Sequence, residues 1–173
     1  TQWVDAVAEF CQHLEDDRPT IAAMFNGGCD PGPVMEIRVG MSDPHHGRRD
    51  VVIATFASGL QLVYKPKDLG IDVAFWSFVD WLNAQSAPED RQLPLHSLKV
   101  LNRSSHGWVE FVNSEPCNNQ AAVERYYQRV GTLLCVTYLL GGTDFHHENI
   151  IASGEQPVLV TASTAFSATA APL

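Results

Sequence analysis

The sequence predicts an α+β fold, in which a small antiparallel sheet is followed by the start of a helical part. Two observations support this class. The β-rich runs 51–56 and 60–65 are joined by a short segment that contains Gly59, which is typical of a hairpin. A long amphipathic segment, 119–140, comes much later and precedes another pair of short apolar runs. Strands and helices that are segregated along a chain are typical of α+β proteins.

The elements of the first part follow from local patterns. Residues 3–14 place apolar side chains on one helical face, and Pro19 is expected to follow this helix. Residues 34–39 alternate in polarity and predict a strand. Pro66 should end the second strand of the hairpin, because proline cannot donate to a β-ladder.

The second part contains a short helix, two short strands and a long helix. Apolar residues at helical spacing predict a helix over 73–83, and strands are expected at 98–101 and 108–112. Asn118 or Asn119 can cap the long helix, which Gly141 and Gly142 should end. We expect this helix to be the buried spine of the second part, with two of its leucines largely inaccessible: Leu133 and Leu134.

Composition limits the function. The chain has 173 residues, which suits one domain, and its formal net charge of -9 argues against a nucleic-acid binder. No apolar run reaches the ~18 residues that would span a membrane, and no signal peptide opens the sequence. We therefore expect a cytoplasmic protein that binds neither nucleic acid nor membrane.

The predicted order is a hairpin ending in a lysine, a helix, two strands, a long helix, a polar loop and a short hairpin. This order matches the part of a protein kinase that runs from its third strand to the strand pair after its catalytic loop. The predicted fold is therefore kinase-like. In this interpretation residues 1–112 form an N-lobe-like part with a leading helix, and residues 113–173 begin the C-lobe with a catalytic-type loop.

Lys65 is the candidate cation of an ATP site. A kinase holds the α- and β-phosphates with a lysine on a strand, and Lys65 ends the predicted strand. The alternative is an ordinary surface lysine at a strand end. The helical carboxylate that would pair with it is not obvious, and Asp80 is the candidate inside the predicted helix.

The segment TDFHHEN is the strongest signal of chemistry. Asp144, His146 and Asn149 follow a long apolar helix and precede a predicted hairpin. An aspartate there can orient or deprotonate a hydroxyl group, and an asparagine can reach a Mg²⁺ ion that bridges phosphates. His146 can order the loop or act as a general acid or base. The alternative is a polar turn between helix and strand.

The segment SDPHHGRRD is a second polar cluster. Asp43 and His45 can act as a base and acid pair, and Arg49, with Arg48 beside it, can bind phosphate oxygens in a bidentate fork. A solvated loop is one alternative. A metal site formed by Asp43, His45 and His46 is another, although adjacent histidines rarely point at one ion.

These residues resemble motifs of one family, the class II lanthipeptide synthetases. GMSDPHHGRRDVVIATF and ASGLQLVYKPKDLGID resemble its G-D-x-H loop and V-Y-K-P strand. HGWVEFV resembles its Y-G-W-x-E-F strand, and YYQRVGTLLCVTYLLGGTDFHHENIIASGEQPVLV resembles its long helix, T-D-x-H-x-E-N loop and next strand. The resemblance runs from about Gly40 to Val160, with several motifs in the same order.

The resemblance implies a dehydratase with a lipid-kinase-like fold. Such domains use ATP and Mg²⁺ to phosphorylate Ser and Thr of a precursor peptide, and then eliminate phosphate to give dehydroalanine and dehydrobutyrine. A separate zinc-bearing cyclase domain is expected in the full-length family protein. Carried over, Lys65 would hold ATP phosphates, Asp144 would serve the substrate hydroxyl with His146 nearby, Asn149 would bind Mg²⁺, and Asp43 and His45 would belong to the elimination step.

The sequence departs from the family pattern at defined positions. Ser42 replaces the glycine of the first motif, and Thr161 and Ser163 stand where the family has the Asp and Glu of its D-x-E-T motif. A neutral hydroxyl is a poor replacement for a carboxylate on Mg²⁺. We therefore expect an incomplete or inactive copy of the dehydratase. A non-catalytic nucleotide- or peptide-binding module and a small-molecule phosphotransferase are the alternatives.

Overall fold

The computed structural model describes residues 2–39, 51–85, 93–142, 149–160 and 162, and these residues form two compact units. Unit 1 consists of Thr1–Leu69 and Lys99–Phe111, and unit 2 of Gly70–Leu98 and Val112–Leu173. Helices and a small antiparallel sheet both occur, which confirms the α+β class. Whether the units correspond to the lobes of a kinase stays a prediction.

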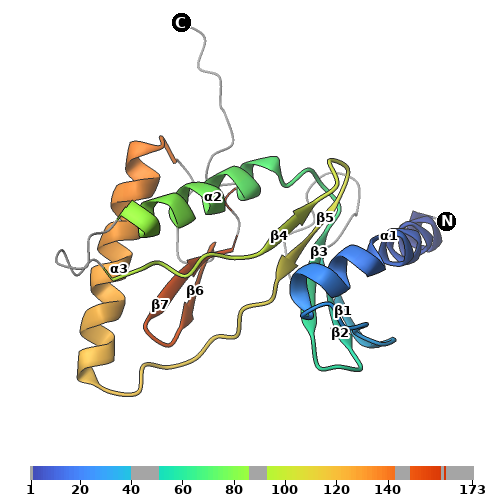
Figure 1. Cartoon of the computed structure of the whole chain (residues 1–173), viewed down its shortest axis with the longest axis horizontal. Helices are drawn as coiled ribbons and strands as arrows, with labels where there is room; N and C mark the ends of the chain where they lie inside the picture. Colours follow the sequence, from blue (N-terminus) through green and yellow to red (C-terminus); the bar gives the residue numbers. More distant parts are fainter. Residues whose placement is uncertain (1, 40–50, 86–92, 143–148, 161, 163–173) are drawn as a thin grey trace, which may run out of the picture. The chain divides into compact units, whose positions relative to one another are not determined.

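Unit 1 is a helix on a five-stranded antiparallel sheet (Figure 1). The helix is α1, and the strands follow the spatial order β1-β2-β3-β5-β4, which places β3 at the centre. The bounds of these elements are α1 Gln2–Phe25, β1 Val34–Val39, β2 Val52–Phe56, β3 Gln61–Lys65, β4 Val100–Asn102 and β5 Gly107–Glu110. The hairpin of β2 and β3, predicted from the sequence, is confirmed by their antiparallel register.

The core of unit 1 lies between α1 and one face of the sheet. Phe10 and Ile21 of α1 share a buried cluster with Leu62, Tyr64 and Trp108 of the central strands. The rings of Phe10 and Tyr64 meet edge to face at 5.1 Å, an arrangement that aromatic pairs favour. Side chains alternate between faces along a strand, so β3 turns Leu62 and Tyr64 towards α1 and its other residues away from it.

The prediction that Pro19 follows the first helix is wrong. The helix α1 continues through Pro19 to Phe25. Proline removes one helical hydrogen bond and crowds the preceding turn, so the helix needs support on both sides of it. Asp17 and Ile21 supply this support, because both side chains are buried against the sheet and its loops.

Unit 2 combines two helices with a two-stranded antiparallel sheet (Figure 1). Its elements are α2 Gly70–Gln85, α3 Gln120–Leu139, β6 Ile150–Ser153 and β7 Gln156–Leu159. The predicted cap is confirmed, because the Asn119 side chain accepts a hydrogen bond of 2.9 Å from the Ala122 amide. The predicted stop is confirmed as well: Gly141 has a φ of 74°, which glycine adopts readily at a helix end.

The buried face of α3 is narrower than its apolar pattern suggested. Leu133 is 1% exposed, which confirms its predicted burial, but Leu134 is 53% exposed and that prediction is wrong. The buried positions recur at helical spacing, and one of them is a charged residue: Ala122, Arg129, Leu133, Val136 and Thr137. Leu134 is one step around the helix from Leu133, about 100°, and therefore leaves the buried face. Among the described residues, no helix is long and apolar enough to cross a membrane.

Candidate functional site

Lys65 is the last residue of β3, the central strand of unit 1. Because Tyr64 packs towards α1, Lys65 belongs to the opposite face of the sheet. Lys65 is only 6% exposed, which does not fit the alternative of a solvated surface lysine. A buried ammonium group needs polar or anionic partners, so this position suits the binding of negative charge.

Gly107 explains how tightly the chain packs beside Lys65. Gly107 is on β5, where it lies directly opposite Lys65 of β3 on one side and Asn102 of β4 on the other. A Cβ atom at Gly107 would come within 2.5 Å of both the Leu101 carbonyl oxygen and the Leu69 side chain. Only glycine fits this position without displacing its neighbours.

Asn102 fixes the segment that follows Lys65. Its side-chain oxygen accepts a hydrogen bond of 3.0 Å from the Leu69 amide, and its side-chain nitrogen donates to Asp68 at 2.8 Å. The residues after the strand are thereby tied to the end of β4. The backbone on both sides of Lys65 is therefore held in place.

The opposite face of the same strands carries a buried carboxylate. Asp17 of α1 is 3% exposed, and its Oδ2 accepts a hydrogen bond of 2.8 Å from the indole Nε1 of Trp108. The ring of His106 also bonds Oδ2 at 2.8 Å, and Nε of Arg103 donates to Oδ1 at 2.7 Å. Trp108 pairs with Tyr64 across the β3–β5 ladder, so Asp17 helps to hold the two strands that carry Lys65 and Gly107.

In unit 2, Asn149 lies at the open end of the β6–β7 hairpin. Its carbonyl oxygen accepts a hydrogen bond of 2.9 Å from the Val160 amide, next to the paired residues Ile150 and Leu159. This bond places Asn149 opposite the residue that precedes Thr161. Thr161, which the resemblance assigns to the metal site, itself lies outside the described residues.

The other end of the hairpin is clamped to α3. Glu155 in the turn pairs with Arg125, and one of its carboxylate oxygens lies 3.5 Å from the buried Arg129. Arg129 also donates to the backbone oxygens of Glu155, at 3.2 Å, and Pro94, at 3.0 Å. A two-stranded hairpin is marginal on its own, so this clamp fixes the hairpin that carries Asn149.

The carboxylates of α2 differ from the expectation. Asp80, the predicted candidate inside this helix, lies on its exposed side, whereas Asp72 in the first turn is 2% exposed. Asp72 was missed because the predicted helix began at residue 73, and the actual helix begins at Gly70. Asp72 is the buried carboxylate of α2.

Most of the predicted site residues lie outside the described residues: Asp43, His45, Arg48, Arg49, Asp144 and His146. The alternative metal site, which also needs His46, lies there too. Within the described ranges, no group of three or more His, Cys, Asp and Glu side chains could hold a metal ion. Lys65 and Asn149 belong to different units, so the convergence of the predicted residues on one site stays a prediction.

Comparison with known proteins places the chain in a family. Residues 1–172 match a family described as a domain of unknown function (DUF4135). A curated relative, the lacticin 481/lactococcin biosynthesis protein LcnDR2 of Lactococcus lactis subsp. lactis, is 34% identical over 129 residues. The aligned region is 72% of this chain and 14% of the relative's length. The chain therefore belongs to the DUF4135 family and is of the class II lanthipeptide synthetase type.

Proposed function

We propose that the chain is the ATP-binding part of a lanthipeptide dehydratase with a kinase-like fold, which acts on Ser and Thr residues of a precursor peptide. The observation that carries the proposal is Lys65, a buried cation fixed at the end of the central strand of an antiparallel sheet. The name of the relative, a lacticin 481/lactococcin biosynthesis protein, supports the substrate class.

The described residues fit ATP and Mg²⁺ in the donors that they offer. Lys65 offers a cation whose backbone is fixed by two β-ladders, as phosphate binding requires. Asn149 offers an amide oxygen, the kind of ligand that Mg²⁺ accepts. When bound, ATP supplies the phosphoryl group and Mg²⁺ neutralises part of its charge.

In the first reaction the residues of the chain bind and orient the reactants. Lys65 would hold the phosphates of ATP, and Asn149 would contribute an oxygen to the metal site. Asp144 orients the Ser or Thr hydroxyl group and accepts its proton, while His146 orders the loop around it. The products of this step are a phosphorylated side chain on the peptide and ADP.

In the second reaction the phosphate leaves. Asp43 and His45 act as a pair, in which one removes the α-proton of the phosphorylated residue and the other protonates the departing phosphate. The carbon–oxygen bond breaks as the carbon–carbon double bond forms, giving dehydroalanine from Ser or dehydrobutyrine from Thr. Arg49 binds the oxygens of the leaving phosphate.

Thr161 favours a second candidate, a nucleotide-binding module without turnover. A threonine stands where the family has the aspartate that binds the metal, and Asn149 contributes only a neutral oxygen. Hard cations prefer charged oxygen ligands. This second candidate predicts that the 173-residue chain alone binds nucleotide weakly, with little dependence on Mg²⁺, and leaves peptides unmodified.

The test is calorimetric titration with ATP, with and without Mg²⁺, on the chain and on Lys65→Met. Losing a charged hydrogen bond to phosphate should weaken binding about tenfold or more. Lys67→Met is the matched control, because it removes the same charge two residues away and should change affinity less than about twofold. Equal effects of the two substitutions would contradict the ATP site.

Thr161→Asp separates the two candidates. It should increase the dependence of ATP binding on Mg²⁺, because it restores the anionic oxygen that the family has at this position. Mass spectrometry of a Ser/Thr-rich peptide incubated with each form reads out turnover. Loss of water from the peptide with the unmodified chain would reject the module without turnover and support the dehydratase.

A further inference from the structure

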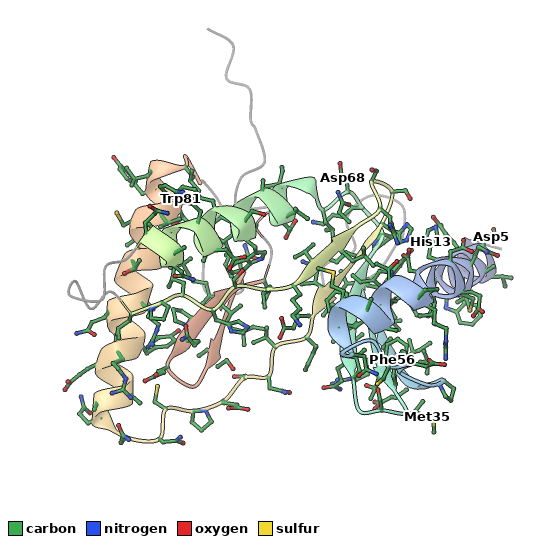
Figure 2. All side chains as sticks on the ribbon, in the orientation of Figure 1. Asp5, His13, Met35, Phe56, Asp68 and Trp81 are labelled. Carbon is green, nitrogen blue, oxygen red and sulfur yellow. The ribbon has the colours of Figure 1, made fainter. Side chains whose placement is uncertain are left out.

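Two stacked histidine rings join α1 to the sheet of unit 1. The rings of His13, on α1, and His106, just before β5, lie parallel at a centroid distance of 3.6 Å and an angle of 3°. Nδ1 of His13 lies 2.8 Å from the Tyr64 hydroxyl, and Nε2 of His106 lies 2.8 Å from Oδ2 of Asp17. Figure 2 shows His13 on α1. The pair therefore links the middle of the helix to β3 and β5.

Asp17 determines which ring nitrogen of His106 carries a hydrogen atom. Burial alone would raise the pKa of Asp17, but hydrogen bonds from His106, Arg103 and Trp108 outweigh it and lower that pKa below its ordinary value. Asp17 is thus ionised at neutral pH, and a carboxylate only accepts hydrogen bonds. His106 must therefore carry a hydrogen atom on Nε2, the nitrogen that faces Asp17.

The surroundings of His13 disfavour its protonation. Burial lowers the pKa of His13, and the nearby His106 lowers it further. Three acidic residues of α1 act in the opposite direction without reversing the shift: Glu9, Asp16 and Asp17. Tyr64, on β3, bonds the ring, and Arg103, in the β4–β5 turn, lies on the far side of Asp17. A neutral His13 satisfies the Tyr64 hydroxyl in either tautomer, because a hydroxyl group donates and accepts.

We propose that the stacked pair His13–His106 is a proton-sensitive latch that holds the middle of α1 on the sheet, and that proton uptake by His13 releases the helix locally. A proton on His13 would place a charge in a half-buried stack beside a second imidazole. The apolar anchors of α1 are the buried Phe10 and Ile21 and the partly buried Leu14, Met24 and Phe25, whereas Trp3, Val4 and Val7 near its start are exposed. Opening part of a helix costs less free energy than unfolding the whole unit.

The direction of the pH dependence follows from the sign of the shift. His13 has a lower pKa when α1 is docked than its ordinary value of 6.5, so the released helix binds the proton more readily. The latch is therefore complete above about pH 6.5 and weakens as the pH falls below it. Asp17 loses its charge only below its ordinary value of 3.8, so its titration belongs to a separate, more acidic window.

Hydrogen exchange measured by mass spectrometry on the full chain tests the latch, at about pH 7.5, 6.5 and 5.5 and corrected for intrinsic exchange rates. One proton changes an opening equilibrium by at most about tenfold per pH unit. We expect the equilibrium constant for opening of α1 to increase about threefold or more as the pH falls across this range. The opening constants of β2 and β3 should change less. If α1 and β3 open together, or if exchange in α1 does not depend on pH, the proposal is overturned.

Two variants of His13 and one control variant test whether the pH dependence comes from His13. His13→Phe keeps an aromatic ring against His106 but cannot take up a proton, so the pH dependence of α1 should disappear. His13→Asn is a second variant that does not titrate in this range, should the phenylalanine not fit. The exposed His96 of unit 2 is the control, and His96→Gln should retain the pH dependence of the original chain. A pH dependence that persists in both His13 variants would refute the latch.

Discussion

The two units hold their candidate residues in different ways. Unit 1 places Lys65 in the middle of a five-stranded sheet, with a neighbouring strand on each side and a helix packed on the opposite face. Unit 2 places Asn149 at the open end of a two-stranded hairpin, whose strand β7 is largely buried and whose turn is held to α3 by Glu155. The first arrangement relies on buried rings and one carboxylate, and the second on the buried Val158 and Leu159 together with a partly exposed ion-pair clamp.

The difference fits the tasks proposed for the two residues. A cation that holds phosphates must stay at one position, and a central strand gives it little freedom. A short two-stranded hairpin is less firmly held than a five-stranded sheet, so a residue at its end can adjust more when a ligand binds. Substitutions in unit 1 should therefore lower the free energy of unfolding more than substitutions in the clamp of unit 2.

The largest effect is expected from Asp17→Ala in unit 1. The substitution removes the acceptor of His106, Trp108 and Arg103, and breaking such a buried ionic group costs about 3–5 kcal/mol. Urea denaturation followed by circular dichroism measures the loss. Asp16→Ala is the control, because Asp16 is exposed and its removal should cost less than about 0.5 kcal/mol. Similar losses for both would show that unit 1 does not depend on the buried carboxylate.

A pair of leucines sharpens the description of α3. Leu133→Ala should lower the free energy of unfolding by about 2–5 kcal/mol, because the side chain is fully buried and leaves a cavity. Leu134→Ala should cost less than about 0.5 kcal/mol, since that side chain is largely exposed. The same denaturation experiment compares them. If both substitutions lowered the free energy of unfolding equally, α3 would bury a wider face than the structure shows.

The smallest effect is expected from Glu155→Gln in the clamp. The side chain is a third exposed, and Arg129 keeps its bonds to two backbone oxygens, so we expect a loss of about 1 kcal/mol. Hydrogen exchange in β6 and β7 should increase with it. Glu124→Gln, on the exposed side of α3, is the control and should leave both measurements unchanged. A loss as large as that of Asp17→Ala would remove the contrast between the units.

Local signals predicted much of the fold. The Gly-containing turn between two β-rich runs identified the hairpin that ends in Lys65, and Asn119 with Gly141 identified both ends of α3. These features depend on residues close in sequence, where turn and cap chemistry is decisive. Leu133 was identified by the helical period of its apolar neighbours.

The misses have long-range causes. His106 and Asp17 lie 89 residues apart, and nothing local shows that an aspartate on a helix will accept bonds from a distant loop. The same contacts stabilise α1 on both sides of Pro19, although local rules predict that a helix ends at a proline. Arg129 occupies a buried position of α3 that an apolar pattern does not include, and its helical spacing from Leu133 was the signal that could have found it.

The order of the strands has a consequence for synthesis of the chain. The partner that β3 meets first is β2, its neighbour in the hairpin, while β5 follows only after the 70–98 segment of unit 2. During translation β3 is therefore an edge strand until residues 107–110 leave the ribosome. For that interval the strand that carries Lys65 has an unpaired side, open to pairing with another chain. Because the units are interleaved in sequence, neither can be complete before part of the other has been synthesised.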